Sequence, residues 1–259
     1  MILTFDIGNG SVVMCCVEEG EKRARFVLSS RKERSADEYS VTMELLARRS
    51  GIDLQSVSGA IIASVVPQLT PVISGAVERV AGCLPMIVGP GVKSGLNIRM
   101  DDPTELGGDL VAAAVAALER YPLPCVIVDL GTATAIGVID AKGSYIGGLI
   151  CPGVALSQSS LAQGASQLSD ISLDAPKRLI GKSTKESMQS GLIYGEAAML
   201  DGIIDRIAAE LGSPVSVVVT GDSAKDVIPY CRSSARIHID DDLVMRGLWR
   251  IYCKNREVK

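Results

Sequence analysis

The first half of the chain opens with two apolar segments that a turn sequence separates. Residues 2–5 and 12–17 are apolar and the residues between them are rich in glycine, so the pattern predicts a β-hairpin. Ser35 and Glu38 have the spacing of a capping box, which predicts a helix that continues to residue 49. Further strands are expected at residues 25–30, 60–66 and 86–88.

The second half has a similar order of elements. Residues 125–128 and 135–139 predict another strand, turn and strand, and Ser183 with Glu186 forms a second capping box. The long helix that starts there is expected to end just before Gly212, in the C′ position. Strands that alternate with helices indicate an α/β fold with a mainly parallel core. The other expected elements are helices at residues 110–120 and 242–255 and a strand at 215–219.

One short sequence occurs twice. Asp6-Ile7-Gly8 and Asp129-Leu130-Gly131 both follow an apolar strand and precede a second strand, 129 − 6 = 123 positions apart. A repeat at nearly half the chain length predicts two tandem domains of like topology. We expect an N-terminal domain over residues 1–118 and a C-terminal domain over residues 119–259.

Composition and charge exclude several classes of partner. Apolar residues make up 47% and charged residues 22% of the chain, as in globular proteins. The 26 basic and 30 acidic residues give a net charge of −4, and only 3% of residues are aromatic. Nucleic acid is therefore not an expected partner, because its binding needs a basic face and stacking side chains. No apolar segment approaches the length of a membrane span, so the expected partners are small molecules.

The seven cysteines have irregular spacings and form no Cys-x-x-Cys pair, so they predict neither a disulfide framework nor a zinc site. Most lie in apolar segments, which is typical of core cysteines in a reducing cytosol. The N-terminal residues lack the basic region of a signal peptide, and we expect a cytoplasmic protein. The single histidine, His238, excludes a histidine metal cluster or a His-dependent triad.

The repeated Asp-x-Gly turn allows a specific chemistry. A carboxylate at a strand end can hold hydrated Mg²⁺, and the glycine lets backbone amides approach phosphate oxygens. Ordinary turn chemistry is the better interpretation of a single copy. Two copies at strand ends, together with the later Thr220-Gly221 turn, favour a pair of loops that clamp a nucleotide.

Asp109 follows a Gly-Gly turn at the start of a predicted helix. Its carboxyl group is either an ordinary N-cap or a general base that accepts a proton from a substrate hydroxyl group. The positive end of the helix is expected to lower the pKa of this carboxyl. Gly191 and Gly195, inside the long helix, predict a close helix contact, either within the chain or across a dimer.

Several short motifs occur in order along the chain, and together they resemble those of the type III pantothenate kinases. The resemblance covers essentially the whole sequence. The motifs that carry it are Asp6-Ile7-Gly8-Asn9, Ser35-Ala36-Asp37-Glu38-Tyr39, Ser64-Val65-Val66-Pro67, Gly89-Pro90-Gly91-Val92-Lys93, Gly95-Leu96-Asn97-Ile98-Arg99, Gly107-Gly108-Asp109, Asp129-Leu130-Gly131-Thr132-Ala133-Thr134, Gly147-Gly148-Leu149-Ile150-Cys151-Pro152-Gly153 and Met188-Gln189-Ser190-Gly191.

This resemblance implies an actin-like fold, in which two ribonuclease H-like domains surround an interdomain cleft. It implies phosphorylation of pantothenate to 4′-phosphopantothenate, the first step of coenzyme A biosynthesis. ATP is the implied co-substrate, with Mg²⁺ and a monovalent cation, K⁺ or NH₄⁺. The implied assembly is a homodimer with an active site shared between the subunits.

The resemblance also implies roles for individual residues. Asp109 is the implied general base, and Asp129 the implied ligand of the monovalent cation. Asp6 is expected to bind Mg²⁺ through water, Thr132 to bind the nucleotide phosphates, and Thr184 to reach the substrate pocket from the partner subunit. The implied first phosphate loop consists of Asp6, Ile7, Gly8, Asn9, Gly10, Ser11, Val12 and Val13. The other implied substrate-binding residues are Met100, Gly107, Gly108, Asp109 and Leu110.

The chain departs from the family pattern at several of these positions. Leu110 stands where the family has arginine, Met100 where it usually has tyrosine, and Gly10 where it usually has threonine. Neither Leu110 nor Met100 can donate a side-chain hydrogen bond to a carboxylate substrate. The departures predict weakened recognition of pantothenate. The alternatives are a family member with an altered substrate and a non-catalytic nucleotide-binding or regulatory protein.

Overall fold

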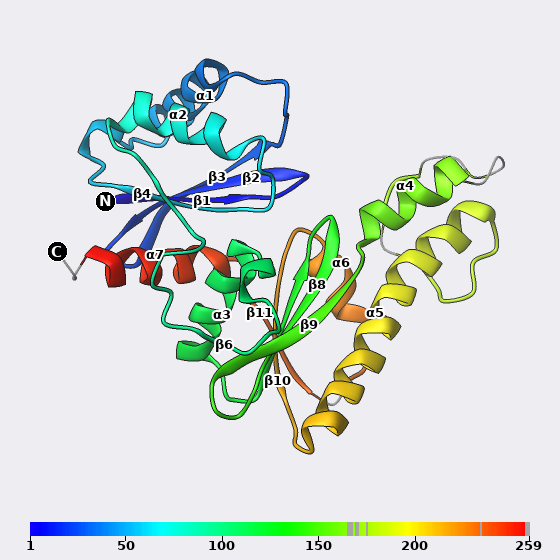
Figure 1. The fold of residues 1–259 in the computed structure, drawn as a ribbon. Coiled ribbons are helices and arrows are strands. Elements are labelled where there is room, and N and C mark those ends of the chain that lie inside the picture. Colours follow the sequence, from blue (N-terminus) through cyan, green and yellow to red (C-terminus); the bar gives the residue numbers. More distant parts are fainter. Residues whose placement is uncertain (165–167, 169–170, 175, 234, 257–259) are drawn as a thin grey trace. The chain divides into compact units, whose positions relative to one another are not determined.

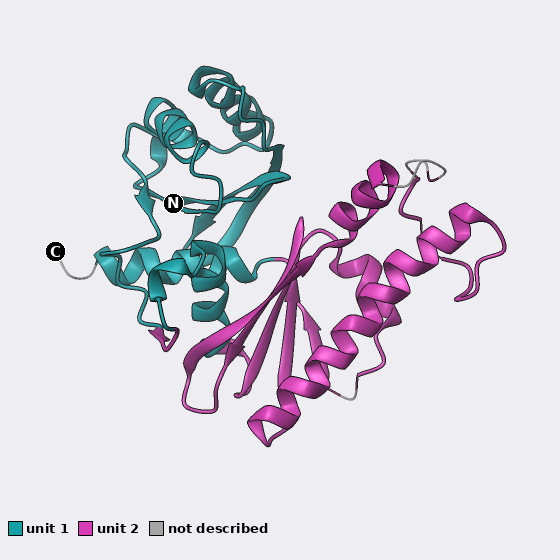
Figure 2. Ribbon diagram, turned by 45° about the vertical axis from the view of Figure 1, so that its right-hand side comes forward, with its two compact units in different colours: residues 1–96, 101–119, 242–259 teal, residues 97–100, 120–241 magenta. Residues whose placement is uncertain are grey.

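The computed structural model describes residues 1–164, 168, 171–174, 176–233 and 235–256 of the chain. They form two compact units, each with its own sheet (Figure 2). Unit 1 contains Met1–Leu96, Asp101–Glu119 and the C-terminal segment from Asp242, and unit 2 contains Asn97–Met100 and Arg120–Asp241. The domains expected from the sequence, residues 1–118 and 119–259, differ from these units mainly in the last helix, which belongs to unit 1.

The sheet of unit 1 combines the first hairpin with parallel strands. Its strands are β1 (Ile2–Ile7), β2 (Ser11–Glu18), β3 (Glu21–Ser29), β4 (Ala60–Ser64) and β5 (Met86–Ile87). The strand order is β3-β2-β1-β4-β5, in which β1, β4 and β5 are parallel and β2 is antiparallel to both of its neighbours. In β1, Leu3, Thr4 and Phe5 are all buried, as expected for a central strand covered on both faces.

Helices cover both faces of this sheet. The helices of unit 1 are α1 (Ala36–Arg49), α2 (Thr70–Ala81), α3 (Gly108–Arg120) and α7 (Leu243–Arg256), with short 3₁₀ turns at Leu54–Ser56 and Pro103–Glu105. The helices α1 and α2 pack on one face, and α7 contacts β1 and β4 on the other (Figure 1). A Cβ atom at Gly247 in α7 would stand 1.8 Å from the carbonyl oxygen of Ala112 in α3. The contacts of α7 with β1 and β4 and its close approach to α3 place the last helix in unit 1.

Unit 2 is built around the second hairpin. Its strands are β6 (Asn97–Ile98), β7 (Cys125–Leu130), β8 (Ala133–Ile139), β9 (Ser144–Pro152), β10 (Ser216–Thr220) and β11 (Arg236–Ile239). The strand order is β11-β10-β7-β8-β9-β6, with β7, β10 and β11 parallel and β8 antiparallel to both β7 and β9.

The helices of unit 2 are α4 (Val154–Gly164), α5 (Thr184–Leu211) and α6 (Ala224–Val227), followed by a 3₁₀ turn at Ile228–Tyr230. The apolar side of α5 packs on the sheet through residues such as Ile193 and Leu200 (Figure 1). Of the helices that the structure describes, none has the length and apolar character needed to cross a membrane.

Both predicted helix caps are present, with one difference. Ser35 and Glu38 form the complete capping box of α1, because each side chain accepts a hydrogen bond from the other residue's backbone amide. At α5, the hydroxyl oxygen of Ser183 accepts from the amide of Glu186 at 3.2 Å, but the Glu186 carboxylate accepts from the amide of Lys182 instead. The helix ends at Gly212 in a left-handed conformation, as its C′ position predicts.

Candidate active site

The first hairpin presents an exposed loop at the carboxyl end of β1. The loop is closed by a hydrogen bond from the amide of Gly8 to the carbonyl oxygen of Ser11, at 2.9 Å. Ser30 also holds the loop through two hydrogen bonds. Its amide donates to the carbonyl oxygen of Gly10 at 3.2 Å, and its hydroxyl group donates to the carbonyl oxygen of Gly8 at 2.5 Å. Asn9 and Gly10 are exposed at the tip. This arrangement can present backbone amides to an anionic ligand.

The carboxyl ends of the parallel strands in unit 1 meet at the start of α3. The amide of Val65, just after β4, donates to the carbonyl oxygen of Ile7 at 3.0 Å. A Cβ atom at Gly107 would lie 3.3 Å from the Val65 side chain, and one at Gly108 would lie 3.3 Å from Val88, which follows β5. Ligands of open α/β sheets bind at the carboxyl ends of the strands, so this edge is a candidate substrate site.

Asp109 lies in the first turn of α3, where it is partly buried. Its Oδ1 atom accepts a hydrogen bond from the amide of Leu110 at 2.8 Å. Burial raises the pKa of the Asp109 carboxyl above its ordinary value, against the opposing effect of its backbone hydrogen bonds. The expectation of a lowered pKa is therefore wrong, because removal from water outweighs the stabilisation that the helix amides supply.

Asp109 also differs from the predicted N-cap. The helix already includes Gly108, so Asp109 stands inside its first turn, and the side chain bonds to the next amide along the chain. A partly buried carboxylate with a raised pKa is a stronger base than an exposed aspartate. The geometry is therefore compatible with proton abstraction from a hydroxyl group.

The turn of the second hairpin, in unit 2, is shorter than the loop of the first. Gly131 and Thr132 separate β7 from β8, and Thr132 is exposed. The amide of Gly153 donates to the carbonyl oxygen of Thr132 at 3.2 Å. A Cβ atom at Gly153 would lie 2.5 Å from the carbonyl oxygen of Gly131, and one at Gly221 would lie 2.5 Å from Oδ1 of Asp129. Two glycines therefore let the backbone pack directly against this turn and against the Asp129 carboxylate.

The predicted site residues fall in both units. Unit 1 holds the whole first phosphate loop, together with Gly107, Gly108, Asp109 and Leu110. Unit 2 holds Met100, Asp129, Thr132 and Thr184. Leu110 and Met100 are partly buried, whereas Thr184 is exposed at the start of α5.

The sequence alone indicated no role in the site for three residues. Ser30 has no motif that marks it as the support of the first loop. Gly153 lies in one of the quoted motifs, but its contact with the second hairpin depends on the path of β9. Glu196 in α5 is buried, and its carboxyl group accepts a hydrogen bond from Thr134. The sequence feature that could have identified it is an acidic residue on the apolar face of a helix.

Residues that could hold a metal are single carboxylates at strand ends. Among the described residues, no group of three or more histidine, cysteine, aspartate or glutamate side chains is placed to bind an ion. Asp6 and Asp129 both lie near the carboxyl ends of their strands and are partly buried. Mg²⁺ usually retains waters and takes one or two carboxylates plus substrate phosphates, so a lone carboxylate of this kind fits a nucleotide-bound ion.

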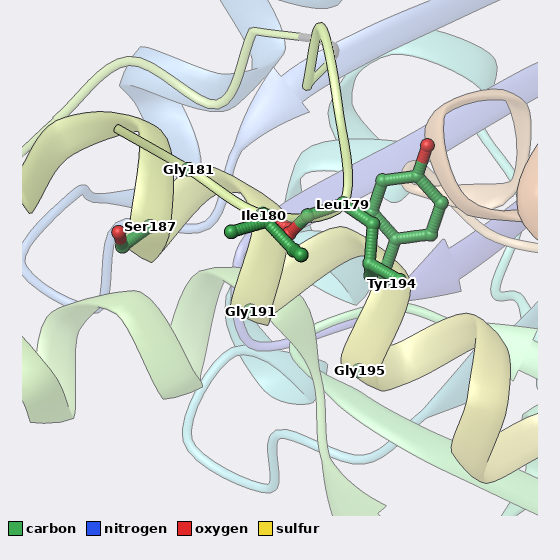
Figure 3. A pocket seen from close by; sticks show the side chains of 8 residues that line it. Leu179, Ile180, Gly181, Ser187, Gly191, Tyr194 and Gly195 are labelled. Carbon is green, nitrogen blue, oxygen red and sulfur yellow. The ribbon is translucent and has the colours of Figure 1, made fainter. Parts of the chain in front are cut away.

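An open groove of about 410 Å³ lies along the N-terminal half of α5, within unit 2 (Figure 3). Leu179 and Ile180, both exposed, form one wall, and Tyr194 forms part of the other. Cβ atoms at Gly191 and Gly195 would meet no other atom within 4 Å. The close contact predicted for these two glycines is therefore not made by the described part of the chain.

Solved structures with little sequence identity share the fold. A ROK hexokinase from Thermus thermophilus matches with a TM-score of 0.56 at 10% identity, over 99% of each chain. Component A of the (R)-2-hydroxyglutaryl-CoA dehydratase of Acidaminococcus fermentans matches with a TM-score of 0.57 at 14% identity, over 100% of this chain and 99% of that chain. The likeness confirms the predicted class, an α/β fold of the actin-like, ribonuclease H-like type.

Sequence comparison gives a more specific result. The model of the type III pantothenate kinase family matches residues 2–206. The type III pantothenate kinase of Moorella thermoacetica is 38% identical over 255 residues, which cover 98% of this chain and 100% of the relative. That of Shouchella clausii is 40% identical over 259 residues, 99% of this chain and 100% of the relative. The chain belongs to the type III pantothenate kinase family.

Proposed function

We propose that the protein transfers the γ-phosphoryl group of ATP to the primary hydroxyl group of pantothenate, the first step of coenzyme A biosynthesis. Membership of the type III pantothenate kinase family supports this proposal. The observation that carries the proposal is Asp109, a partly buried carboxyl with a raised pKa at the start of α3, beside the chain that follows β4.

In this proposal Asp109 is the general base. It accepts the hydroxyl proton as the substrate oxygen attacks the γ-phosphorus in line. The amide of Leu110 fixes the orientation of the carboxyl group through its 2.8 Å hydrogen bond. Phosphoryl transfer depends mainly on positioning and electrostatic stabilisation, so a rigidly held base next to the substrate hydroxyl is the main chemical contribution of unit 1.

The two hairpins are the proposed phosphate-binding elements. Asn9 and Gly10 of the first loop are exposed, so phosphate oxygens can approach them. The exposed hydroxyl of Thr132 is available for the same purpose at the second hairpin. Asp6 is proposed to hold Mg²⁺ through water and Asp129 a monovalent cation, K⁺ or NH₄⁺. The bound Mg²⁺ supplies positive charge that neutralises the phosphate oxygens.

The proposed pantothenate pocket includes Gly107, Gly108, Leu110, Met100 and Thr184. Leu110 and Met100 replace residues that donate hydrogen bonds in the resembled kinases, and one lost charge-assisted hydrogen bond weakens binding by about 10- to 150-fold. We therefore expect a high KM for pantothenate. The double variant Leu110→Arg with Met100→Tyr should lower this KM, and an unchanged KM and kcat would show that other side chains already hold the carboxylate.

A homodimer with a shared active site is also proposed. The open groove beside Gly191 and Gly195, with the exposed Leu179 and Ile180 on its wall, supports an interface along α5. Thr184 lies at the exposed start of the same helix, from which it can reach a partner's pocket. Mixed subunits carrying Asp109→Ala and Thr184→Ala should recover part of the activity. A fully active monomer in sedimentation would contradict this assembly.

A second candidate is a nucleotide-binding protein without kinase activity, which Leu110 favours because it removes the charge expected next to the base. Nucleotide binding raises the melting temperature in both cases, since a ligand of the native state stabilises it. Pantothenate should add a further increase only if the substrate pocket is intact. The two candidates therefore differ in the thermal shift that pantothenate causes.

The direct test is a coupled assay of ADP release with ATP, Mg²⁺, K⁺ and pantothenate. We expect pantothenate-dependent turnover, and a loss of about 10²- to 10⁴-fold in the Asp109→Asn variant, which keeps the size of the side chain but cannot act as a base. A wild-type rate equal to that of Asp109→Asn would refute the assigned base. No pantothenate-dependent turnover at any substrate concentration would refute the proposed activity.

A further inference from the structure

An acidic residue occupies the apolar side of α5. Glu196 has only 7% of its surface exposed, and Ile193, Ala197 and Leu200 around it belong to the apolar core of unit 2. Burial raises the pKa of the Glu196 carboxyl above its ordinary value. A carboxyl group is costly to place in such a core unless it is hydrogen-bonded. Apolar residues normally occupy such a position, which suggests that the carboxyl group of Glu196 has a specific role.

Its partner belongs to the second hairpin. The Thr134 hydroxyl group in β8 donates a hydrogen bond to Oε1 of Glu196, and this bond lowers the pKa of the carboxyl against the effect of burial. Thr134 is fully buried and pairs with Leu130 across the hairpin. It follows Thr132 by two residues. The bond therefore ties the middle of α5 to the base of the turn that carries Thr132.

We propose that Glu196 is a positioning residue for the nucleotide phosphates, which acts through Thr134 on the turn at Gly131 and Thr132. This inference rests on the proposed function. Gly153 fixes the same turn by its amide, and Gly221 packs against Asp129. The Thr134–Glu196 bond adds the contact from the core side of the sheet. Held in this way, the Thr132 hydroxyl keeps one position before the nucleotide arrives, which lowers the ordering cost of binding.

A purely structural pair would behave differently from a positioning pair. Replacing both partners of a buried polar pair by apolar residues is often neutral for stability, whereas removing one partner leaves the other unsatisfied. Stability and nucleotide affinity can therefore be separated by comparing Thr134→Val with the double variant Thr134→Val, Glu196→Met. The conservative Thr134→Ser variant keeps the hydroxyl donor.

A matched control lies in the same sheet. The hydroxyl of Ser216, in β10, donates to the carbonyl oxygen of Pro122 at 2.5 Å. Ser216 is buried like Thr134, but it pairs with Cys125, at the opposite end of β7 from the turn. Ser216→Ala therefore removes a buried hydrogen bond from unit 2 without altering the base of the second hairpin.

The experiment measures the affinity for a non-hydrolysable ATP analogue by calorimetry, the KM for ATP and for pantothenate, and the melting temperature. We expect Thr134→Val to weaken nucleotide binding and raise the KM for ATP about 10-fold while the KM for pantothenate changes less than about 2-fold. Thr134→Ser should restore nucleotide affinity. Ser216→Ala should lower the melting temperature without changing that affinity.

The double variant is decisive. We expect it to recover the melting temperature of the wild type but not the affinity for the nucleotide. The inference would be overturned if the double variant recovers nucleotide affinity together with stability, or if Thr134→Val does not change that affinity. Thr134 and Glu196 would then have only a structural role. Because nucleotide binding is measured without pantothenate, a wild type that binds nucleotide but does not phosphorylate pantothenate would refute the proposed function while this test still stands.

Discussion

The two Asp-x-Gly hairpins share their strand pairing but differ in how tightly the surrounding chain encloses their turns. Asp6 pairs with Val13 in the first hairpin, and Asp129 pairs with Ala135 in the second. Residues 8–10 separate β1 from β2, whereas only residues 131 and 132 separate β7 from β8. The same sequence device thus yields a longer loop in unit 1 and a minimal turn in unit 2.

The packing around the turns differs more than their length. A Cβ atom at Gly8 would meet the carbonyl oxygen of Ser11 at 3.4 Å, which is an ordinary contact. At the second hairpin, Cβ atoms at Gly153 and Gly221 would approach backbone or carboxylate oxygens within 2.5 Å. The comparison teaches that other segments of unit 2, at Gly153 and Gly221, pack closely against the second turn. A Cβ atom at Gly131, within that turn, would still have room, because its nearest neighbours would lie 3.6 Å away.

The largest effect is expected from Gly153→Ala. The new methyl group would overlap the carbonyl oxygens of Gly131 and Thr132, and neither backbone can move without displacing the turn. Overpacking of this kind costs about 1–3 kcal/mol of stability. Displacement of the turn that we propose binds the phosphates should lower kcat/KM for ATP about 100-fold. Steady-state kinetics and chemical denaturation check both effects.

The matched control for this variant is Gly8→Ala in the first loop. Its added methyl group has space, so stability should change by less than about 1 kcal/mol. If Gly153→Ala and Gly8→Ala destabilise the protein equally, the contrast in packing between the two hairpins is wrong.

The carboxylates of the two hairpins should differ in their ion dependence. Asp129→Asn should remove most of the activation by K⁺ and reduce kcat about 10-fold, whereas Asp6→Asn should raise the Mg²⁺ concentration needed for half-maximal rate. The measurement is a titration of each ion at saturating ATP for both variants. A K⁺ response that survives in Asp129→Asn but disappears in Asp6→Asn would reverse the two assignments.

A pH profile tests the carboxyl of unit 1 that lies outside both hairpins. Since burial raises the pKa of Asp109 above 3.8, the acid limb of kcat should lie at a higher pH than an exposed aspartate would give. The raised pKa also means that Asp109 stabilises the fold only at low pH and loses this contribution as the pH rises through its folded pKa.

Asp109→Asn should therefore raise the melting temperature at pH 7, although it reduces activity. A lower melting temperature in this variant would show that the ionised carboxylate is stabilised in the fold, contrary to the direction of its pKa shift. The Asp109→Asn protein should also lack the acid limb in its residual rate.

Much of the fold follows from local sequence signals. The capping residues Ser35 and Ser183 mark the starts of α1 and α5, because their hydroxyl oxygens satisfy amides that a helix leaves unpaired. The paired Asp-x-Gly turns predict both hairpins for the same kind of local reason. These signals need no knowledge of the surrounding chain.

Other elements lack a side-chain cap or an Asp-x-Gly turn. Neither α2 nor β9 is among the elements expected from the sequence, although both are well-defined elements of the structure. The helix α2 begins without a side-chain cap, and β9 contains Gly147 and Gly148, which strand propensities disfavour. Gly148 is placed there by packing, since an added Cβ atom would lie 1.9 Å from the carbonyl oxygen of Ile136.

The site shows the same limit. Asp109 was identifiable from its motif, but the direction of its pKa shift was not, because the burial that raises this pKa depends on how the folded chain surrounds the start of α3. The roles of Gly153 and Glu196 at the second hairpin arise from chain segments far away in the sequence. The type of a residue and its motif are known from the local sequence, whereas the groups that surround it are known only from the folded structure.

The most direct test of the account is to identify the product by mass spectrometry after incubation with ATP, Mg²⁺, K⁺ and pantothenate. We expect one phosphoryl group on pantothenate for each ADP formed, and no phosphorylated product when pantothenate lacks its primary hydroxyl group. ADP that accumulates without phosphorylated pantothenate, or a phosphoryl group found on another position, would contradict the proposed reaction at Asp109.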